Sequence, residues 1–260
     1  MLKERYFLGI DVGTSYIKAV IIDNKNEIIG SSTDRSGADL QKSITAIFKE
    51  LTTAADIPQH TIKHITATGF GRRNVSFADS IKTEIGCHAK GSYHYFPRKI
   101  TIIDIGAQDT KIIKIDAKGK TLGFKMNRKC AAGTGAFLEE IANRLGIPMS
   151  EMNMLAAKST KDTALSSFCT VFASTEILTR IKDGERIEDM VKSAFESVAR
   201  RVIEMDTLDG TIVMTGGVVT YNDFILKALT NNVGSKILTP PNPQLTGAIG
   251  AALFAREAKD

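Results

Sequence analysis

The feature that most constrains the fold is an internal repeat. Residues 9–23, GIDVGTSYIKAVIID, align with residues 102–116, IIDIGAQDTKIIKID, at a constant offset of 93 residues. Six of the 15 aligned positions are identical, including the Asp and Gly at the centre. Each copy predicts a β-strand, a tight glycine turn, a second strand and a polar turn. A chance likeness of two hairpins is the alternative, but the shared Asp and Gly favour a duplicated unit.

The turn of each hairpin is suited to binding phosphate. Gly13 and Gly106 let the backbone approach a phosphate closely, and neighbouring N–H groups can point at its oxygens. Thr14 and Ser15 add hydroxyl donors in the first copy, and Gln108 lies in the matching turn of the second. Neither turn is a Walker A loop, because GxxxxGK[ST] is absent from the sequence.

Asp11 and Asp104 end the first strand of each hairpin, and we predict that they hold Mg²⁺ largely through water. Gln108 is a candidate for orienting the attacking water, although a plain turn hydrogen bond is an open alternative. Lys18 and Lys111 follow the turns, and their side chains face either a ligand or solvent.

A third glycine element lies late in the chain. Residues 211–224, TIVMTGGVVTYNDF, predict a buried strand that breaks at Gly216-Gly217 into a helix, a shape suited to adenine and ribose. A helix is also predicted over 38–57, a short strand over 64–70 and a small-residue helix over 246–258.

Length and composition narrow the class of protein. A chain of 260 residues, 43% hydrophobic and 24% charged, suits one large domain or two lobes. Its 34 Lys and Arg are interspersed with 29 Asp and Glu, so the net charge of +5 forms no stripe for nucleic acid. The sequence has neither a run of about 18 apolar residues nor a signal-peptide core. We therefore expect a cytoplasmic protein that binds neither nucleic acid nor a membrane.

The chain has three cysteines, an odd number that argues against a disulfide framework. Cys130 and Cys169 each lie at or near the start of a helical pattern, where N–H groups and the helix dipole stabilise a thiolate. Two thiolates are half of a four-cysteine set, which a symmetric homodimer would complete. Buried small hydrophobic residues and a shared zinc remain alternatives. We interpret Cys87, with the neighbouring His88, as structural rather than as a ligand.

The order of these elements resembles that of the actin/Hsp70/sugar-kinase superfamily. More narrowly, the chain resembles the ATP-dependent activators of 2-hydroxyacyl-CoA dehydratases, of the BadF/BadG/BcrA/BcrD type, which are related to benzoyl-CoA reductase ATPase subunits. This resemblance covers nearly the whole chain. It rests on TGFGR (68–72), FADSIKTEIGCHAKG (77–91), DIGAQDTK (104–111), MNRKCAAGTGAFLE (126–139), FCTVFASTEI (168–177) and MTGGV (214–218).

The resemblance implies a two-lobed α/β actin-like ATPase fold of duplicated ribonuclease-H-like lobes, with the nucleotide in the cleft between them. We predict that 1–98 with 240–260 form lobe I and that 99–239 form lobe II. The residues expected to contact ATP or ADP lie in the two hairpins, in the CAAGTG segment and in the MTGGV segment. They are Gly13, Thr14, Ser15, Lys18, Gly106, Ala107, Gln108, Gly133, Thr134, Gly135, Gly216, Gly217 and Val218.

The resemblance also implies a function. Cys130 and Cys169 of two identical subunits would hold one [4Fe–4S] cluster, and ATP hydrolysis would drive an electron from a ferredoxin or flavodoxin to an iron–sulfur dehydratase or reductase component. One rival is a sugar or amino-sugar kinase of the same superfamily, for which the chain has little room for substrate-binding insertions. Another rival is a non-redox nucleotide switch.

Overall fold

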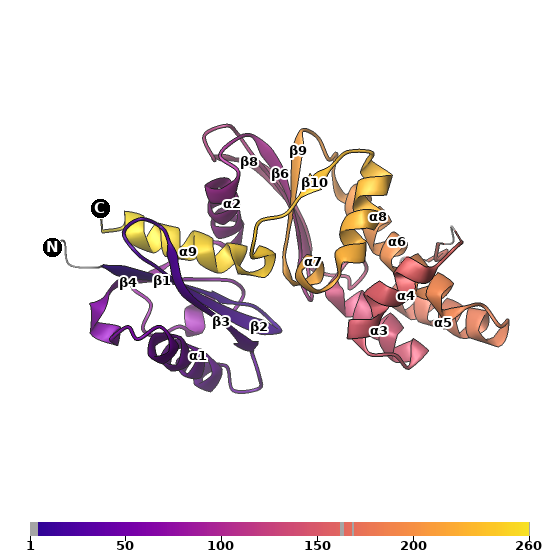
Figure 1. Cartoon of the computed structure of the whole chain (residues 1–260), viewed down its shortest axis with the longest axis horizontal. Helices are drawn as coiled ribbons and strands as arrows, with labels where there is room; N and C mark the ends of the chain where they lie inside the picture. The colour runs from indigo at the N-terminus through magenta and orange to yellow at the C-terminus, as the bar shows by residue number, and fades with distance from the viewer. Residues whose placement is uncertain (1–4, 162–163, 168, 260) are drawn as a thin grey trace. The chain divides into compact units, whose positions relative to one another are not determined.

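The computed structural model describes residues 5–161, 164–167 and 169–259, and the chain divides into two compact units (Figure 1). Unit 1 comprises Met1–Arg98, Ile115–Thr121 and Leu245–Asp260, and unit 2 comprises Lys99–Lys114 and Leu122–Gln244. Phe168, the first residue of the 168–177 motif, lies outside the described residues. Within the described ranges, no helix combines the length and hydrophobicity that a bilayer-spanning segment requires.

Unit 1 contains a five-stranded sheet in the order β3-β2-β1-β4-β5. β1 pairs antiparallel with β2 and parallel with β4. The strands are β1 (Tyr6–Val12), β2 (Tyr16–Ile22), β3 (Ile28–Arg35), β4 (Ile62–Thr68) and β5 (Ser80–Ile81). The helices of this unit are α1 (Leu40–Ala54), α2 (Glu84–Tyr95) and α9 (Thr246–Glu257), with short 3₁₀ turns at Gln59–Thr61 and Arg72–Asn74.

Side-chain alternation along β1 explains how this sheet is covered. Leu8 and Ile10 pack with α1 in one core, whereas Phe7 packs with α9 in another, because successive side chains point to opposite faces. A Cβ on Gly9 would lie 2.0 Å from the Ala248 carbonyl oxygen, so α9 packs directly on the strand backbone. The small residues of α9 permit this approach, and the same alternation places Asp11 on the α9 face.

Unit 2 contains a five-stranded sheet in the order β10-β9-β6-β7-β8. The strands are β6 (Ile100–Ile105), β7 (Thr110–Ile115), β8 (Thr121–Asn127), β9 (Thr211–Thr215) and β10 (Ile237–Leu238). The helices are α3 (Gly135–Leu145), α4 (Met152–Lys158), α5 (Thr170–Lys182), α6 (Ile187–Met205), α7 (Gly217–Tyr221) and α8 (Asp223–Val233), with 3₁₀ turns at Met149–Glu151 and Pro243–Leu245. One core joins β6 to α3, α6 and α8.

The two sheets repeat one strand order. Reading β3-β2-β1-β4-β5 against β8-β7-β6-β9-β10 pairs the first hairpin with the second and β4 with β9. In both sheets the hairpin's first strand pairs parallel with a strand that arrives after a crossover. The internal repeat of the sequence therefore extends to a repeat of whole sheet topology, and the predicted two-lobed α/β fold is confirmed.

Most predicted elements are present, but two strands are not foreseen. The helix expected over 38–57 is α1, which begins after Asp39, whose side chain accepts from the Lys42 N–H at 3.0 Å. The sequence predicts only a polar turn after the second strand of each hairpin, yet a further strand, β3 or β8, follows each turn. Both are edge strands in which no residue is buried, so the hydrophobic alternation that marks a strand is weak there.

Candidate phosphate hairpins and cysteine loops

The turn between β1 and β2 is tightly held. The Gly13 N–H donates to the Tyr16 carbonyl at 3.0 Å, and a Cβ on Gly13 would lie 2.8 Å from that oxygen. Ser36 anchors the turn: its hydroxyl donates to the Gly13 carbonyl at 2.8 Å and its N–H to the Ser15 carbonyl at 3.0 Å. Thr14 is exposed and Ser15 half-buried, so this rigid turn presents hydroxyl groups near solvent.

Asp11 is a buried carboxylate with an unused oxygen. Its Oδ2 lies 3.5 Å from Lys18 Nζ, directly across the hairpin, whereas Oδ1 has no hydrogen-bond partner among the described residues. Gly69 has φ +86°, and a Cβ there would lie 2.4 Å from Oδ1. Burying such an oxygen without a partner is unfavourable. The Asp11 carboxylate therefore fits a ligand that brings a cation, or a water molecule bound to a cation.

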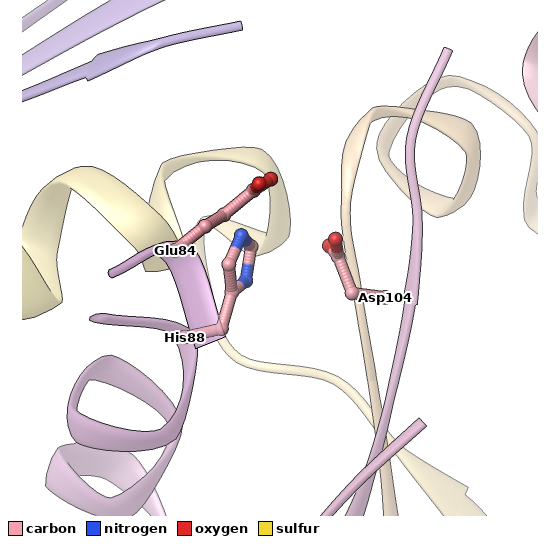
Figure 2. A group of neighbouring side chains, drawn as sticks. All are labelled: Glu84, His88 and Asp104. Carbon is pink, nitrogen blue, oxygen red and sulfur yellow. The ribbon is translucent and has the colours of Figure 1, made fainter. Parts of the chain in front are cut away.

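The second hairpin repeats the turn and adds a second carboxylate. The Gly106 N–H donates to the Asp109 carbonyl at 2.9 Å. Asp104, at the end of β6, accepts from Thr215 Oγ1 at 3.1 Å and from Lys111 Nζ at 3.2 Å. Lys111 also lies 2.7 Å from Asp109 Oδ1. Figure 2 shows the carboxylate of Asp104 extending from β6.

The two hairpins differ in charge. Asp109 stands where the first copy has Tyr16, so the second hairpin has two carboxylates around one ammonium and the first has one. The side chain of Lys111 is 1% exposed and that of Lys18 is 19% exposed. The alternative that both lysines face solvent is therefore wrong for Lys111.

Of the predicted contact residues Gly133, Thr134 and Gly135, the last two have their backbone N–H groups in use within the protein. All three residues are buried. The Thr134 N–H and hydroxyl both donate to the Ala131 carbonyl, and the Gly135 N–H donates to the Gly106 carbonyl at 2.9 Å. The N–H groups of Thr134 and Gly135 therefore shape the loop before α3.

The backbone at Gly216-Gly217 lies close to the side chain of Asp104. Gly216 has φ +100°, and a Cβ there would lie 2.4 Å from the Ile105 carbonyl oxygen and 2.9 Å from Asp104 Oδ1. A Cβ on Gly217 would meet nothing within 4 Å, so that residue borders open space, whereas the Val218 side chain packs in the unit 2 core. In the facing turn Ala107 is half-buried, and Gln108 is exposed.

The three cysteines have two different environments. Cys130 and Cys169 are exposed, and Cys169 is the N-cap residue of α5. Cys87 is fully buried, which raises its pKa to about 12 and keeps its thiol protonated. The interpretation of Cys130 and Cys169 as buried hydrophobic residues is therefore wrong, and their exposed sulfur atoms fit thiolate ligation of a soft metal or cluster.

His88, interpreted from the sequence with Cys87 as structural, lies beside the first hairpin. A Cβ on Gly247, in α9, would lie 3.0 Å from Asp11 Oδ2 and 3.1 Å from His88 Nε2, so both side chains reach the same glycine. Glu84 lies one turn before His88 on α2 (Figure 2). The sequence does not predict the hydrogen bond from Thr215 to Asp104, although Thr215 directly precedes Gly216-Gly217.

Two sheets of repeated topology, each with an Asp–Lys hairpin around a glycine turn, define an actin-like ATPase fold. The chain belongs to the BadF/BadG/BcrA/BcrD ATPase family, whose sequence model matches residues 8–255.

Relatives and solved structures agree with this assignment. The chain is 39% identical to a 2-hydroxyisocaproyl-CoA dehydratase activator of Clostridioides difficile, covering 98% of this chain and 97% of the relative. The crystal structure of component A of the (R)-2-hydroxyglutaryl-CoA dehydratase of Acidaminococcus fermentans matches with TM-score 0.93 and 38% identity, covering 98% of each chain. The activator of the 2-hydroxyisocaproyl-CoA dehydratase from Clostridium difficile with bound ADPNP matches with TM-score 0.91 and 38% identity, covering 97% of this chain and 95% of that one.

Proposed function

We propose that the protein is an ATP-hydrolysing [4Fe–4S] homodimer that drives low-potential electron transfer from a ferredoxin or flavodoxin to a partner iron–sulfur enzyme. The observation that carries this proposal is the contrast among the cysteines. Cys130 and Cys169 are exposed in the same unit, whereas Cys87 is buried and protonated. The two exposed thiols supply half of a four-thiolate set, and a second copy supplies the other half.

The N-terminus of α5 favours an anionic ligand at Cys169. As N-cap residue, Cys169 lies beside the first-turn N–H groups, and the helix dipole adds positive potential there. Both effects stabilise a thiolate and the negative charge of a ligated cluster. The cluster, when bound, supplies one-electron redox chemistry; the chain holds it and controls access to it.

Contact with a second copy fits the exposed apolar surface of α5. Four of its side chains are large, apolar and exposed, in a helix that also carries Cys169 at its start: Val171, Phe172, Leu178 and Ile181. Patches of this kind on a soluble protein mark interaction sites. The same surface that meets the second subunit would therefore bring the second pair of thiols.

In the proposed ATPase reaction, both hairpins bind the phosphates of one nucleotide. Gly13 lets the backbone of the first turn approach the phosphate closely, Thr14 and Ser15 donate hydrogen bonds to it, and Lys18 supplies positive charge. Asp11 holds Mg²⁺ through water, which fits its unpartnered Oδ1.

The second hairpin completes the proposed site. Asp104 is the second carboxylate on the metal side, and Gln108, exposed at the turn, orients the attacking water. Gly216 and Gly217 lie against the nucleoside. Positioning and charge neutralisation then supply the catalysis.

The names of the relatives support the class of electron acceptor. Proteins 38–39% identical to this chain over nearly its full length are named as activators or components of 2-hydroxyacyl-CoA dehydratases. We therefore propose a 2-hydroxyacyl-CoA dehydratase, a related acyl-CoA reductase or a double-cubane cluster protein as the acceptor.

Anaerobic purification tests this function. We expect a brown dimer that contains about four irons. Cys130→Ser and Cys169→Ser should each lose the iron, while Cys87→Ala, the matched control, retains it. ATP-dependent reduction of candidate acceptors then identifies the partner. A colourless monomer that retains ATP hydrolysis would instead favour a non-redox switch, and one that phosphorylates sugars would favour a kinase.

A further inference from the structure

The turn of the second hairpin is hydrogen-bonded to the loop that precedes α3. The Gly135 N–H donates to the Gly106 carbonyl at 2.9 Å, and the Ala136 N–H donates to the Ala107 carbonyl at 2.8 Å. Two carbonyls of the phosphate turn therefore take the first N–H groups of α3, which a helix otherwise leaves to solvent or ligand. The start of α3 cannot keep this position if the turn moves.

Thr110 makes a third connection between the same two segments. It is the first residue of β7, directly after the turn, and it is fully buried. Its hydroxyl donates to the carbonyl of Gly133. Gly133 has φ +82° and packs against the side chain of Arg201, so the direction of its carbonyl is fixed by the loop conformation.

The other end of this loop carries Cys130, and short contacts hold it. The Asn127 side chain, at the end of β8, donates to the Cys130 carbonyl at 3.0 Å and to the Ala132 carbonyl at 2.8 Å. The Thr134 hydroxyl donates to the Ala131 carbonyl at 2.6 Å. Hydrogen bonds from side chains and backbone thus connect the phosphate turn to Gly133 and fix the carbonyls of Cys130, Ala131 and Ala132 in the same loop.

We infer that Thr110 is a positioning residue that transmits movement of the phosphate turn to the Cys130 loop. Its hydroxyl is not aimed at a ligand; it acts through Gly133 on the position of the Cys130 sulfur. This inference rests on the proposed function and deepens it, because it assigns the coupling between nucleotide and cysteine to one side chain.

In the described part of the chain, neither the first hairpin nor the Cys169 backbone is hydrogen-bonded to the segments that join the turn to Cys130; α5 meets α3 further along the helix, where Ser174 donates to Glu140 at 3.2 Å. The turn after β1 is held by Ser36, at the end of β3. The Cys169 N–H donates to Ser167 Oγ, and its carbonyl accepts from Ala173 of its own helix. Nucleotide should therefore change Cys130 more than Cys169.

The test uses the full chain in its cluster-free form, so that both thiols are open to a reagent. Alkylation rates of Cys130 and Cys169 are measured by mass spectrometry with and without ADPNP and Mg²⁺. In the wild type we expect the Cys130 rate to change by about fivefold or more, the lower bound of ordinary coupling between sites. In Thr110→Val, which keeps the shape but removes the donor, that change should fall below about twofold, and Thr110→Ser should restore it.

Thr101→Val is the matched control. Thr101 is also buried in the unit 2 sheet, and its hydroxyl also donates to a carbonyl, that of Asp209, at 2.9 Å, which lies outside the loop that carries Cys130. This variant should keep the wild-type response.

Calorimetric titration with ADPNP separates failure of the proposed function from failure of this inference. A wild type that binds no nucleotide contradicts the proposed function. If nucleotide binds but the Cys130 rate is unchanged, or if Thr110→Val responds like the wild type, the role of Thr110 is wrong.

Hydrogen exchange on the wild type keeps the inference testable if Thr110→Val does not fold. The amides of Gly135 and Ala136, which bond to the turn, should change their protection when ADPNP binds. The Ala173 amide, bonded to the Cys169 carbonyl, serves as the comparison. Nucleotide binding that leaves the Gly135 and Ala136 amides unaltered would overturn the inference without any substitution.

Discussion

The ammonium nitrogen of Lys111 lies 2.7 Å from Oδ1 of Asp109, and only 1% of the lysine side chain is exposed. The same nitrogen lies 3.2 Å from Oδ2 of Asp104, whose side chain is 4% exposed. One buried cation thus compensates two carboxylates at the turn of the second hairpin. Burying charge is unfavourable unless it is paired in this way, so removing the cation should be costly.

Lys111→Met keeps the length of the side chain and removes its charge. We expect a loss of roughly 3 kcal/mol in the free energy of unfolding, at the lower end of the range for breaking a buried pair, because Asp109 stays partly in water. Urea unfolding followed by circular dichroism measures it. Lys114→Met is the control, since Lys114 lies on the same strand and also pairs with two aspartates, Asp206 and Asp209, but at 3.4–3.5 Å and with 28% of its side chain exposed. It should lose at most about 1 kcal/mol; equal losses in the two variants would contradict the buried triad.

Gly69→Ala tests the close approach of the backbone to Asp11. Two effects combine: a positive φ of +86°, which costs on the order of 1 kcal/mol for alanine, and a Cβ that would lie 2.4 Å from Asp11 Oδ1 and 2.5 Å from the Val12 carbonyl oxygen. The second effect displaces the carboxylate, so we expect Mg²⁺–nucleotide affinity to fall by about tenfold or more, equivalent to ~1.4 kcal/mol. Isothermal titration measures that affinity.

Gly146→Ala isolates the backbone contribution to that result. Gly146, after α3, has φ +65°, and a Cβ there would meet nothing within 4 Å. It should lose only the stability that the positive φ costs, on the order of 1 kcal/mol, and keep its nucleotide affinity. A loss of affinity in both variants would mean that the Asp11 contact is not responsible.

Local patterns explain why the hairpins could be predicted. A glycine turn between two apolar runs needs only neighbouring residues to form, and the 93-residue offset identified both copies. The strand and helix around Gly216-Gly217 and the small-residue helix α9 followed from periodicity in the same way.

Contacts between distant segments could not be predicted in this way. Thr215 and Asp104 are 111 residues apart in the chain, and their hydrogen bond depends on β6 and β9 being neighbours in the sheet. Gly69 reaches Asp11 only because β4 pairs with β1. Burial of the Lys111 ammonium likewise depends on the packing around β7, since an isolated lysine after a turn favours solvent.

Asp11→Asn tests the metal-side carboxylate, because it keeps the shape of the side chain and removes its charge. If Asp11 holds Mg²⁺ through water, hydrolysis of ATP should fall by about 10²-fold, the loss of one preorganised electrostatic contact in a buried site. Phosphate release under saturating Mg²⁺ measures it. Asp23→Asn is the control: Asp23 lies at the other end of the same hairpin, where it accepts from the Lys25 and Glu27 N–H groups. Hydrolysis by the Asp11 variant at the wild-type rate would exclude this role.

The Cys87 thiol should make folding stability depend on alkaline pH. Burial raises its pKa from 9.0 to about 12 in the folded chain. Because the folded value lies above the unfolded one, the contribution is fully present below pH 9.0 and is lost as the pH rises toward about 12. The stability advantage of the wild type over Cys87→Ala should therefore shrink across that window in urea titrations. In cluster-free protein at neutral pH, a thiol reagent should modify Cys130 and Cys169 while the chain is folded, and Cys87 only after unfolding. A stability difference that stays constant above pH 9.0 would show that Cys87 titrates alike in both states, and hence that its environment is not closed to water.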